Sequence, residues 1–355
     1  MAPSPEAGAR PAGPPGVTIR HVAADAGVST ATVSRVMSGR GYASGATRQT
    51  VLQAVERLGY RPSASARGLR TARTATLGVL VANLANPVFL PFLRGVEHVA
   101  EAHGYAVLIA DSRRSRDVER HELDTLYAHR VEALIVGESV ENPEHLATLS
   151  EAGLRVVRAP DAGGESTAWS AAAIEAPAIV AACTRLADLG HRRVAYVTGP
   201  ATRPPAPRGS ARRDLVVQTL TVRGVAVEPV TMRGTDDPDR VTSAIRELLD
   251  TPRPPTALLC AAHPLAPRLL RALADADVAL PERVSFLTFG DSPWAAAYRP
   301  AIAVIRRDAY TEGRAVAQRV LYDLGAAPEP GSADPPLATF DPRQSMATPP
   351  AAAPR

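Results

Sequence analysis

The chain of 355 residues contains no lysine, so all 40 of its basic side chains are arginine. It has only two cysteines, Cys183 and Cys260, and both lie in apolar segments. Two isolated cysteines do not make a disulfide framework or a cysteine-rich zinc site, and we expect buried, reduced thiols. The sequence also lacks an apolar run of 18 residues and a secretory hydrophobic segment, which argues against a membrane span and against export.

Sequence motifs of catalysis and cofactor binding are absent as well. No Gly-x-Gly-x-x-Gly, Walker-type or Gly-x-Ser-x-Gly motif occurs, so nothing indicates a nucleotide cofactor or a serine nucleophile. Five histidines lie between residues 98 and 145, but they have neither His-Glu-x-x-His spacing nor cysteine pairs nearby. We interpret them as solvated helix residues. The sequence therefore predicts no enzyme, no cofactor and no metal site.

What the chain does contain is a strongly basic segment near its beginning. Residues 17–73 hold nine arginines against two acids, Asp25 and Glu56, which gives a net charge of +7. Because the whole chain carries only +4 and residues 1–16 are neutral, the remainder is mildly acidic. A compact basic module on an acidic body is typical of a DNA-binding domain joined to a second domain, since phosphates neutralise the arginines.

The apolar pattern of this basic segment predicts three short helices. Apolar residues recur at three- and four-residue spacing from Ile19 to Ala26 and form one helix face. Gly27 ends that helix, Ser29 is a suitable N-cap for a second helix, and Thr47 is the expected cap of a third. Two helices joined by a short glycine-containing turn, the second with a small polar outer face, form a helix-turn-helix. The alternative is a three-helix bundle with a solvated basic face.

An ordered series of motifs runs through the same segment. T-I-x-x-V-A-x-x-A-G-V-S-x-x-T-V-S-R-V is present at 18–36, S-x-x-T-R at 44–48, L-G-Y-x-P at 58–62 and A-R-x-L at 66–69. This series resembles the lactose/galactose repressor (LacI/GalR) family of bacterial transcription regulators, and the resemblance extends over nearly the whole chain. It implies a helix-turn-helix domain, a hinge helix and a two-lobed effector-binding domain.

The resemblance implies a DNA-binding role for ten residues of this segment. They are Ser29, Thr30, Ala31, Ser34, Arg35, Thr47, Arg48, Ser63, Arg67 and Leu69. Thr30, Ala31 and Arg35 match positions that meet bases, and the Arg35 guanidinium can donate to O6 and N7 of one guanine. Ser29, Ser34, Thr47 and Arg48 are implied to contact phosphates. Leu69 matches a hinge leucine that wedges into a minor-groove base step. The alternatives are a phosphate contact for Arg35 and a buried linker position for Leu69.

Beyond residue 73, short apolar runs alternate with helical patterns. The expected strands are 76–81, 105–110, 133–136, 155–157, 194–197, 256–260, 286–289 and 303–305. Continuous apolar runs are expected for parallel strands buried on both faces, and the alternation predicts doubly wound α/β sheets. The family resemblance implies two such lobes, like those of a type I periplasmic binding protein. Three chain crossings are expected near 160–176, 299–302 and 325, with a last strand around 337–340 in the second lobe.

The expected organisation has five parts. Residues 1–16 and 346–355 are rich in alanine and proline and are predicted to be disordered tails. Residues 17–62 form the helix-turn-helix domain, and residues 63–73 form the hinge. Ser63 stands where the family usually has asparagine, but serine is still a suitable cap for a hinge helix. Residues 74–345 form the effector-binding and dimerisation domain.

In the cleft between the lobes, the sequence departs from sugar-binding relatives. Hydroxyl-rich ligands need paired donors and acceptors, and several such positions have changed here. The departures are Ala262-His263 for an Asn-Asp pair, Gly290 for the first acid of Phe-Asp-Asp, Asp214 for the second arginine of Arg-x-Arg, Ile174-Glu175 for an Asp-Asn pair, and Val88 for an aromatic residue. We therefore predict that the usual simple sugar is not bound. The cleft candidates are Asn83, Phe89, Arg212, Asp214, His263, Asp291 and Trp294, and a surface or packing role is the alternative for each.

The leading hypothesis is a repressor that binds double-stranded operator DNA as a homodimer, with its affinity modulated by a small-molecule effector in the cleft. Two-fold protein symmetry implies a pseudo-palindromic operator. The alternative is a constitutive DNA-binding regulator whose cleft no longer binds ligand, which the altered cleft residues favour. A transport-type binding protein is a third class, and the intact basic module argues against it. We expect a cytoplasmic protein associated with the nucleoid.

Overall fold

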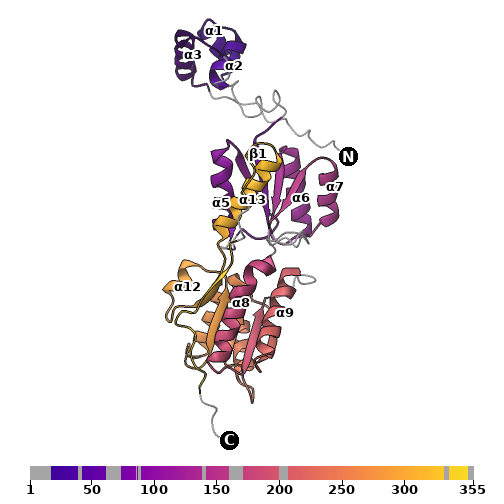
Figure 1. The fold of residues 1–355 in the computed structure, drawn as a ribbon, viewed down its shortest axis with the longest axis vertical. Coiled ribbons are helices and arrows are strands. Elements are labelled where there is room, and N and C mark those ends of the chain that lie inside the picture. Colours follow the sequence, from indigo (N-terminus) through magenta and orange to yellow (C-terminus); the bar gives the residue numbers. More distant parts are fainter. Residues whose placement is uncertain are drawn as a thin grey trace, which may run out of the picture. The chain divides into compact units, whose positions relative to one another are not determined.

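The computed structural model of the chain describes residues 17–38, 42–60, 73–84, 86, 89–137, 141–159, 171–199, 207–331 and 336–350. They belong to two compact units, Met1–Thr74 and Ala75–Arg355 (Figure 1). The predicted hinge positions Ser63, Arg67 and Leu69 lie outside the described residues, as does the predicted tail 1–16.

The N-terminal unit contains three helices around a small core. The helices are α1 (Ile19–Asp25), α2 (Thr30–Ser38) and α3 (Gly45–Leu58). One apolar residue from each helix, Val22, Val33 and Val51, is fully buried in a common cluster. Helical periodicity places these residues on the inner faces and leaves the polar residues outside. The predicted cap of α3 was wrong, because Ser44 accepts the hydrogen bond from the Thr47 N–H (3.2 Å) three residues later.

The first lobe of the second unit is a parallel sheet of four strands in the order β2-β1-β3-β4. The strands are β1 (Thr76–Val81), β2 (Ala106–Asp111), β3 (Ala133–Val136) and β4 (Arg155–Arg158). Its helices are α5 (Phe89–Ala102), α6 (Arg116–Ala128), α7 (Pro143–Glu151) and α13 (Ala309–Asp323). Leu77, Val79 and Ile135 are completely buried, as expected for strands covered on both faces.

Two helices far apart in the sequence pack closely in this lobe. The late helix α13 lies beside α5 (Figure 1). Gly95 and Gly313 allow this approach, because a Cβ atom on either glycine would overlap the backbone of the other helix. The chain therefore returns to the first lobe after it has passed through the second lobe.

The second lobe is a six-stranded sheet in the order β10-β9-β8-β7-β5-β6, parallel except for β10. The strands are β5 (Arg193–Thr198), β6 (Ala226–Thr231), β7 (Ala257–Cys260), β8 (Ser285–Phe289), β9 (Ala303–Arg306) and β10 (Thr339–Asp341). The helices are α8 (Ala171–Asp188), α9 (Pro207–Thr221), α10 (Pro238–Leu249), the 3-10 turn η1 (His263–Leu265), α11 (Ala266–Asp275) and α12 (Pro293–Ala297). Strand β6 was not predicted, since Glu228 and Pro229 interrupt its apolar pattern, which an edge strand tolerates.

The structure gives the positions of the last two chain crossings between the lobes. Strand β9 is still part of the second sheet at Arg306, and α13 begins in the first lobe at Ala309, so this crossing lies at 307–308. The predicted crossing at 299–302 was wrong, because the proline there belongs to the turn before β9. Ala327 still packs against the first-lobe core and β10 pairs with β9, so the return to the second lobe follows residue 327.

The C-terminal boundary also differs from the prediction. Met346 is buried in the core of the second lobe, and the Ala347 N–H donates to Ser285 Oγ at 3.0 Å. A disordered tail beginning at 346 is therefore wrong for these two residues, since a single apolar anchor does not stand out in an alanine- and proline-rich segment. Within the described ranges, no helix is long and apolar enough to cross a membrane.

Candidate nucleic-acid interface and lobe junction

Helix α2 presents a small polar surface on the side opposite its core contacts. Val33 and Val36 are buried, whereas Thr30, Ala31 and Arg35 are exposed. The helix is short and its outer side chains are small apart from Arg35, so it has the dimensions that a major groove accepts. The fold thus brings the three residues predicted to read bases onto one accessible face.

Three of the four residues predicted to contact phosphates lie around the beginnings of α2 and α3, and Ser34 lies in the middle of α2. Ser29 caps α2, because its Oγ accepts the Thr32 N–H at 3.1 Å. Ser34 is half-buried, whereas Arg48 is exposed in the first turn of α3. Thr47 Oγ1 lies 2.8 Å from Ser44 Oγ, within hydrogen-bond distance. The two hydroxyls of Ser29 and Thr47 therefore take part in hydrogen bonds at the starts of α2 and α3.

In the second unit, Arg212 and Glu175 form a buried ion pair between α9 and α8. Arg212 Nε donates to Glu175 Oε2 at 2.9 Å and Nη2 donates to Oε1 at 2.7 Å. Arg212 Nη1 also donates to the Ala261 carbonyl at 3.2 Å, and its guanidinium carbon lies 3.9 Å from the ring centre of Phe289. This two-pronged geometry is the strongest form of an arginine–carboxylate contact.

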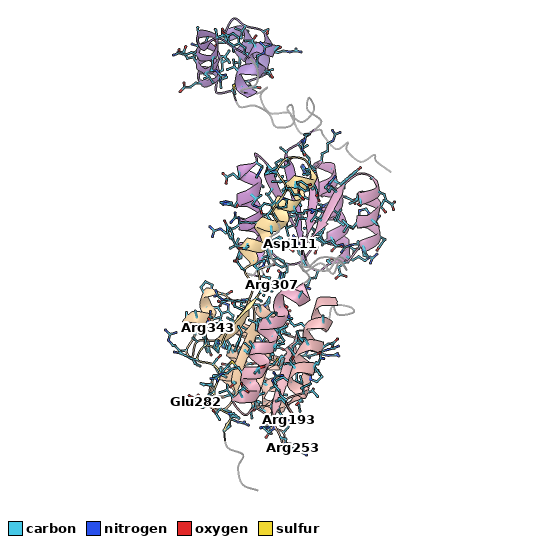
Figure 2. The ribbon with its side chains drawn as sticks, viewed as in Figure 1. Asp111, Arg193, Arg253, Glu282, Arg307 and Arg343 are labelled. Atoms are coloured by element: carbon cyan, nitrogen blue, oxygen red, sulfur yellow. The ribbon has the colours of Figure 1, made fainter. Side chains whose placement is uncertain are left out.

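A second ion pair joins the crossing segment to α13. Arg307 donates from Nε to Glu312 Oε1 at 2.8 Å and from Nη2 to Glu312 Oε2. Arg307 lies between the two lobes (Figure 2), and its Nη1 is 3.9 Å from Glu175 Oε1. We call Glu175, Arg212, Arg307 and Glu312 the junction cluster. Because its members come from both lobes, it links them through buried charges.

Two of the predicted cleft residues, His263 and Trp294, contact each other instead of an open space. The His263 ring stacks on Trp294 with 5.4 Å between ring centres, and its Nε2 lies 2.7 Å from Ser292 Oγ. Burial lowers the pKa of His263, which favours the neutral ring. The aromatic face of Trp294 is therefore already covered on one side.

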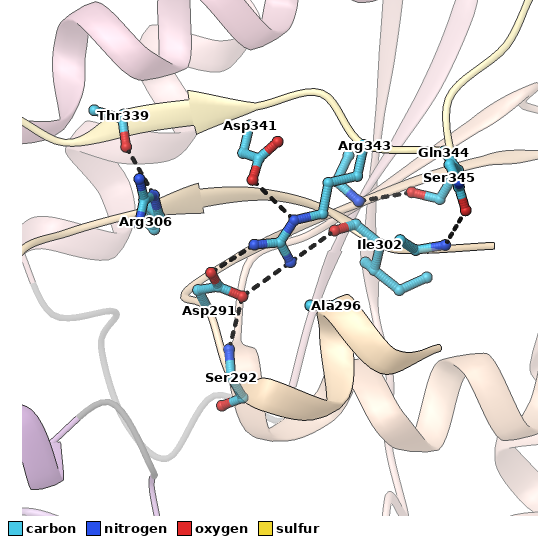
Figure 3. Close-up of polar contacts among 12 residues, drawn as sticks. Asp291, Ser292, Ala296, Ile302, Arg306, Thr339, Asp341, Arg343, Gln344 and Ser345 are labelled. Atoms are coloured by element: carbon cyan, nitrogen blue, oxygen red, sulfur yellow. Dashed lines mark hydrogen bonds and ion pairs between the residues drawn. The ribbon is translucent and has the colours of Figure 1, made fainter. Parts of the chain in front are cut away.

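Asp291 is held by an arginine from the end of the chain (Figure 3). Arg343 Nη2 donates to Asp291 Oδ2 at 2.7 Å and Nη1 donates to Oδ1 at 3.0 Å, while Nε donates to Asp341 at 2.9 Å. The Ser292 N–H donates to Asp291 Oδ1 at 2.9 Å. These bonds tie the loop after β8 to the segment after β10.

The remaining three candidates lie apart from these groups. The Asp214 side chain is 66 % exposed and pairs with its neighbour Arg213. Phe89 is buried in the first-lobe core. The Asn83 carbonyl accepts the Asn86 N–H at 3.1 Å in the loop after β1. The structure therefore places His263, Trp294 and Asp291 around the loop after β8, Arg212 in the ion pair with Glu175, and the other three candidates apart from both groups.

Several charged residues of these ion pairs were missed by the sequence analysis. Glu175 was noted only as a changed position, and Arg307, Glu312 and Arg343 belong to no motif. A signal was available for Arg307, because it follows the predicted strand 303–305 and polar residues at strand ends often face a site. Nothing in the sequence pairs Arg343 with Asp291.

A groove of about 710 Å³ lies between the outer face of α5 in the first lobe and the loop before α12 in the second lobe. It is lined by Leu90, Pro91, Arg94, Glu97, His98, Glu101, Asp291, Ser292, Pro293 and Tyr310. Its lining includes charged residues of both signs. In the part of the chain that the structure describes, no group of three or more His, Cys, Asp or Glu residues could hold a metal ion.

The two cysteines are buried and unpaired, as predicted. Burial raises the pKa of both the Cys183 and the Cys260 thiol to about 12. Neither thiol ionises near neutral pH, so both behave as apolar core residues.

Comparison with known proteins places the chain in a family. Residues 18–63 match the model of bacterial regulatory proteins, lacI family, and residues 183–346 match the periplasmic binding protein-like domain. The chain is 30% identical over 306 residues to catabolite control protein A of Priestia megaterium, covering 86% of this chain and 91% of that protein. The chain belongs to the lacI family. This lacI-family protein is also 32% identical to the transcriptional regulator GalS of Salmonella typhimurium, over 82% of its length and 85% of that of GalS.

Solved structures confirm the fold class of this lacI-family protein. The lac repressor dimer bound to operator superimposes with a TM-score of 0.77 at 20% identity, covering 94% of this chain and 99% of that one. The regulator CelR in complex with cellobiose gives a TM-score of 0.62 at 25% identity, with 93% and 100% covered. The predicted helix-turn-helix domain and periplasmic-binding-protein-like domain are confirmed. Since the family consists of transcriptional regulators, the protein is a DNA-binding transcriptional regulator and not an enzyme.

Proposed function

We propose that this regulator is a repressor that binds a pseudo-palindromic operator as a homodimer, with α2 in the major groove of each half-site. The observation that carries the proposal is the exposed face of Thr30, Ala31 and Arg35 on a helix whose other face is fixed in the core. Arg35 reads a guanine through a two-pronged contact, and Ser29, Ser34, Thr47 and Arg48 contact phosphates that set the orientation.

Exposed apolar residues on the first lobe support the homodimer. Strand β2 is at the edge of its sheet and exposes Leu108 and Ile109, the latter by 49 %. The adjacent helix α5 exposes Leu90 by 62 %. Apolar side chains along an open sheet edge favour association unless they are covered. A second copy related by a two-fold axis covers them and presents two heads to a symmetric operator.

The hinge residues complete this proposal on the strength of the family resemblance. The resemblance implies that Ser63 caps a hinge helix, that Arg67 contacts DNA and that Leu69 wedges into a minor-groove step. Replacing Leu69 by alanine is expected to reduce DNA bending and affinity while leaving the fold of both units unchanged. Equal bending by the wild type and by Leu69→Ala, measured by energy transfer between labelled DNA ends, would contradict the wedge.

The experiment that tests the operator proposal is selection of binding sites from random duplexes with the purified full chain. We expect enriched sites with two inverted half-sites and a complex of two protein chains per duplex by analytical ultracentrifugation. A single asymmetric half-site, or a complex with one chain, would overturn the dimeric assignment. Absence of any enriched sequence would overturn sequence-specific binding itself.

Two candidates are open for the lobe junction. In the first, a small-molecule effector that is not a simple sugar modulates DNA affinity; it would bind Arg212 through its guanidinium only by displacing Glu175. In the second, the regulator is constitutive, and the buried Arg212–Glu175 pair favours this. Thermal melts against sugars, sugar phosphates, nucleosides and small acids separate the two, because a bound ligand stabilises the folded state. Micromolar binding of a hexose would contradict both.

A further inference from the structure

Two guanidinium groups converge on the carboxylate of Glu175. Arg212 holds both carboxylate oxygens, at 2.9 and 2.7 Å, and Arg307 Nη1 lies 3.9 Å from Oε1 on another side. Arg307 is itself neutralised by Glu312, so the junction cluster has two positive and two negative charges. Among the described residues, Glu175 is therefore the carboxylate that forms the ion pair with Arg212.

This carboxylate lies where a doubly wound sheet ordinarily binds a ligand. Arg212 contacts the Ala261 carbonyl, one residue beyond the end of β7, and the ring of Phe289, the last residue of β8. Ligands of open α/β sheets bind outside the carboxyl ends of the strands. The Glu175 side chain, carried by α8, thus extends to the ligand-binding edge of the second lobe.

The cluster is buried as well as paired. The exposed fractions of the side chains are 3 % for Glu175, 12 % for Arg212 and 7 % for Arg307. A neutral hydroxyl that entered this position would have to separate a buried carboxylate from a buried guanidinium, and uncompensated buried charges are strongly unfavourable. A sugar hydroxyl forms weaker hydrogen bonds than the charged groups that it would replace.

We propose that Glu175 is an internal occupant of the ligand position, with its carboxylate held between Arg212 and Arg307 in the place of a bound anion. Glu175 thereby determines the specificity of the junction by excluding neutral sugars. This inference rests on the proposed function in so far as the junction is taken as the effector site.

The proposal predicts that free acetate can take the place of the Glu175 side chain once that side chain is removed. Glu175→Ala removes the side chain beyond Cβ, which is a methylene group and a carboxylate. Free acetate has the same two carbons and the same charge, so it fits the space and the two guanidinium groups that the substitution exposes. The same substitution at an exposed ion pair leaves no enclosed site for acetate, because solvent fills the space.

The test compares melting temperatures of full-length wild type and Glu175→Ala in increasing sodium acetate, with sodium chloride at equal ionic strength as the reference. We expect Glu175→Ala to melt below the wild type in chloride and to regain several degrees in acetate along a saturating curve. The wild type should respond equally to the two salts. Glu144→Ala, which removes the partner of Arg116 in an exposed pair, is the matched control and should show no acetate-specific shift. Adding Arg212→Gln to Glu175→Ala should abolish the rescue.

Equal curves in acetate and chloride for Glu175→Ala would overturn the proposal, as would an equal acetate response of the wild type. If Glu175→Ala does not yield folded protein, Glu175→Gln provides the decision, because it keeps the shape and removes the charge. An unchanged melting temperature of Glu175→Gln would show that the carboxylate is not the required counter-ion. None of these readouts involves DNA, so operator selection can fail or succeed independently of them.

Discussion

The DNA-binding head and the lobe junction use arginine in opposite ways. In the head, Arg35 and Arg48 extend from helix surfaces whose inner faces are closed by valine and alanine. At the junction, the side chains of Arg212 and Arg307 are only 12 % and 7 % exposed, and each is matched to a carboxylate of this chain. A surface intended for phosphates presents its cations outward, since the partner supplies the neutralising charge. Buried cations have to be neutralised by the protein itself.

The largest effect is expected from breaking the junction. Glu175→Ala leaves Arg212 without its counter-ion in a buried place and should lower the free energy of unfolding by about 3–5 kcal/mol. Urea denaturation followed by tryptophan fluorescence measures this, because both tryptophans, Trp169 and Trp294, belong to the second unit. Asp214→Ala, at an exposed pair, is the control and should cost less than about 1 kcal/mol. Equal losses in the two variants would remove the contrast between buried and exposed charge.

The next effect concerns the outward-facing arginine of the head. Arg35→Ala should weaken specific operator binding by about 1–3 kcal/mol and relax the preference at one base position. The urea midpoint of the second unit should not change. Arg48→Ala should weaken binding to all sequences alike, since a phosphate contact carries no base information. An unaltered site preference in Arg35→Ala, after repeated selection, would assign Arg35 to the phosphates instead.

A lower pH should reduce the stability of the second unit, and this effect should be smaller than those of the two substitutions above. His191 is fully buried between Thr256 Oγ1 (2.8 Å) and Ser285 Oγ (3.1 Å), and burial lowers its pKa from 6.5 to about 4. The unfolded chain therefore takes up this proton first, and stability of the second unit should fall as the pH decreases from 6.5 towards 4. In His191→Gln, the urea midpoint should depend less steeply on pH over this range. A profile as steep as that of the wild type would exclude His191 as the titrating group.

The smallest effect is expected for the ion pair inside the head. Arg57 Nη2 lies 2.6 Å from Asp25 Oδ2 and joins α3 to α1, but the Arg57 side chain is 61 % exposed. Asp25→Ala should change head stability by only about 0.2–1 kcal/mol, because water and salt screen such pairs. Amide hydrogen exchange of α1 and α3 reports on the head alone. If the protection factors of α1 and α3 fell as far in Asp25→Ala as those of the second unit fall in Glu175→Ala, the contrast between exposed and buried ion pairs would be contradicted.

Much of the fold could be predicted because it depends on local pattern. Helical periodicity and glycine breaks indicated the three head helices, and continuous apolar runs indicated the buried parallel strands. Strand β6 was missed because Pro229 and Glu228 break its pattern, and an edge strand needs no continuous apolar run. The crossing at 307–308 was predicted at 299–302 instead, because a turn and a crossing have the same local composition.

The candidate sites were predictable to different degrees for a related reason. The positions of the head that we propose to read bases lie within one helix, so helical geometry alone puts Thr30, Ala31 and Arg35 on one face. The candidates for the cleft come from many elements, and only the packed chain shows that Asp291 is held by Arg343 and that Asp214 is exposed.

The sequence by itself determined the family, the helix-turn-helix and the two-lobed α/β plan, because ordered motifs and apolar periods act over a few neighbouring residues. Only the tertiary structure decided which charges meet at the junction. Glu175 and Arg212 are 37 residues apart, and Asp291 and Arg343 are 52 apart. Such pairs form where the packing of helices and strand ends brings the two side chains together. Their closeness in space therefore depends on the whole fold and not on any local segment of the sequence.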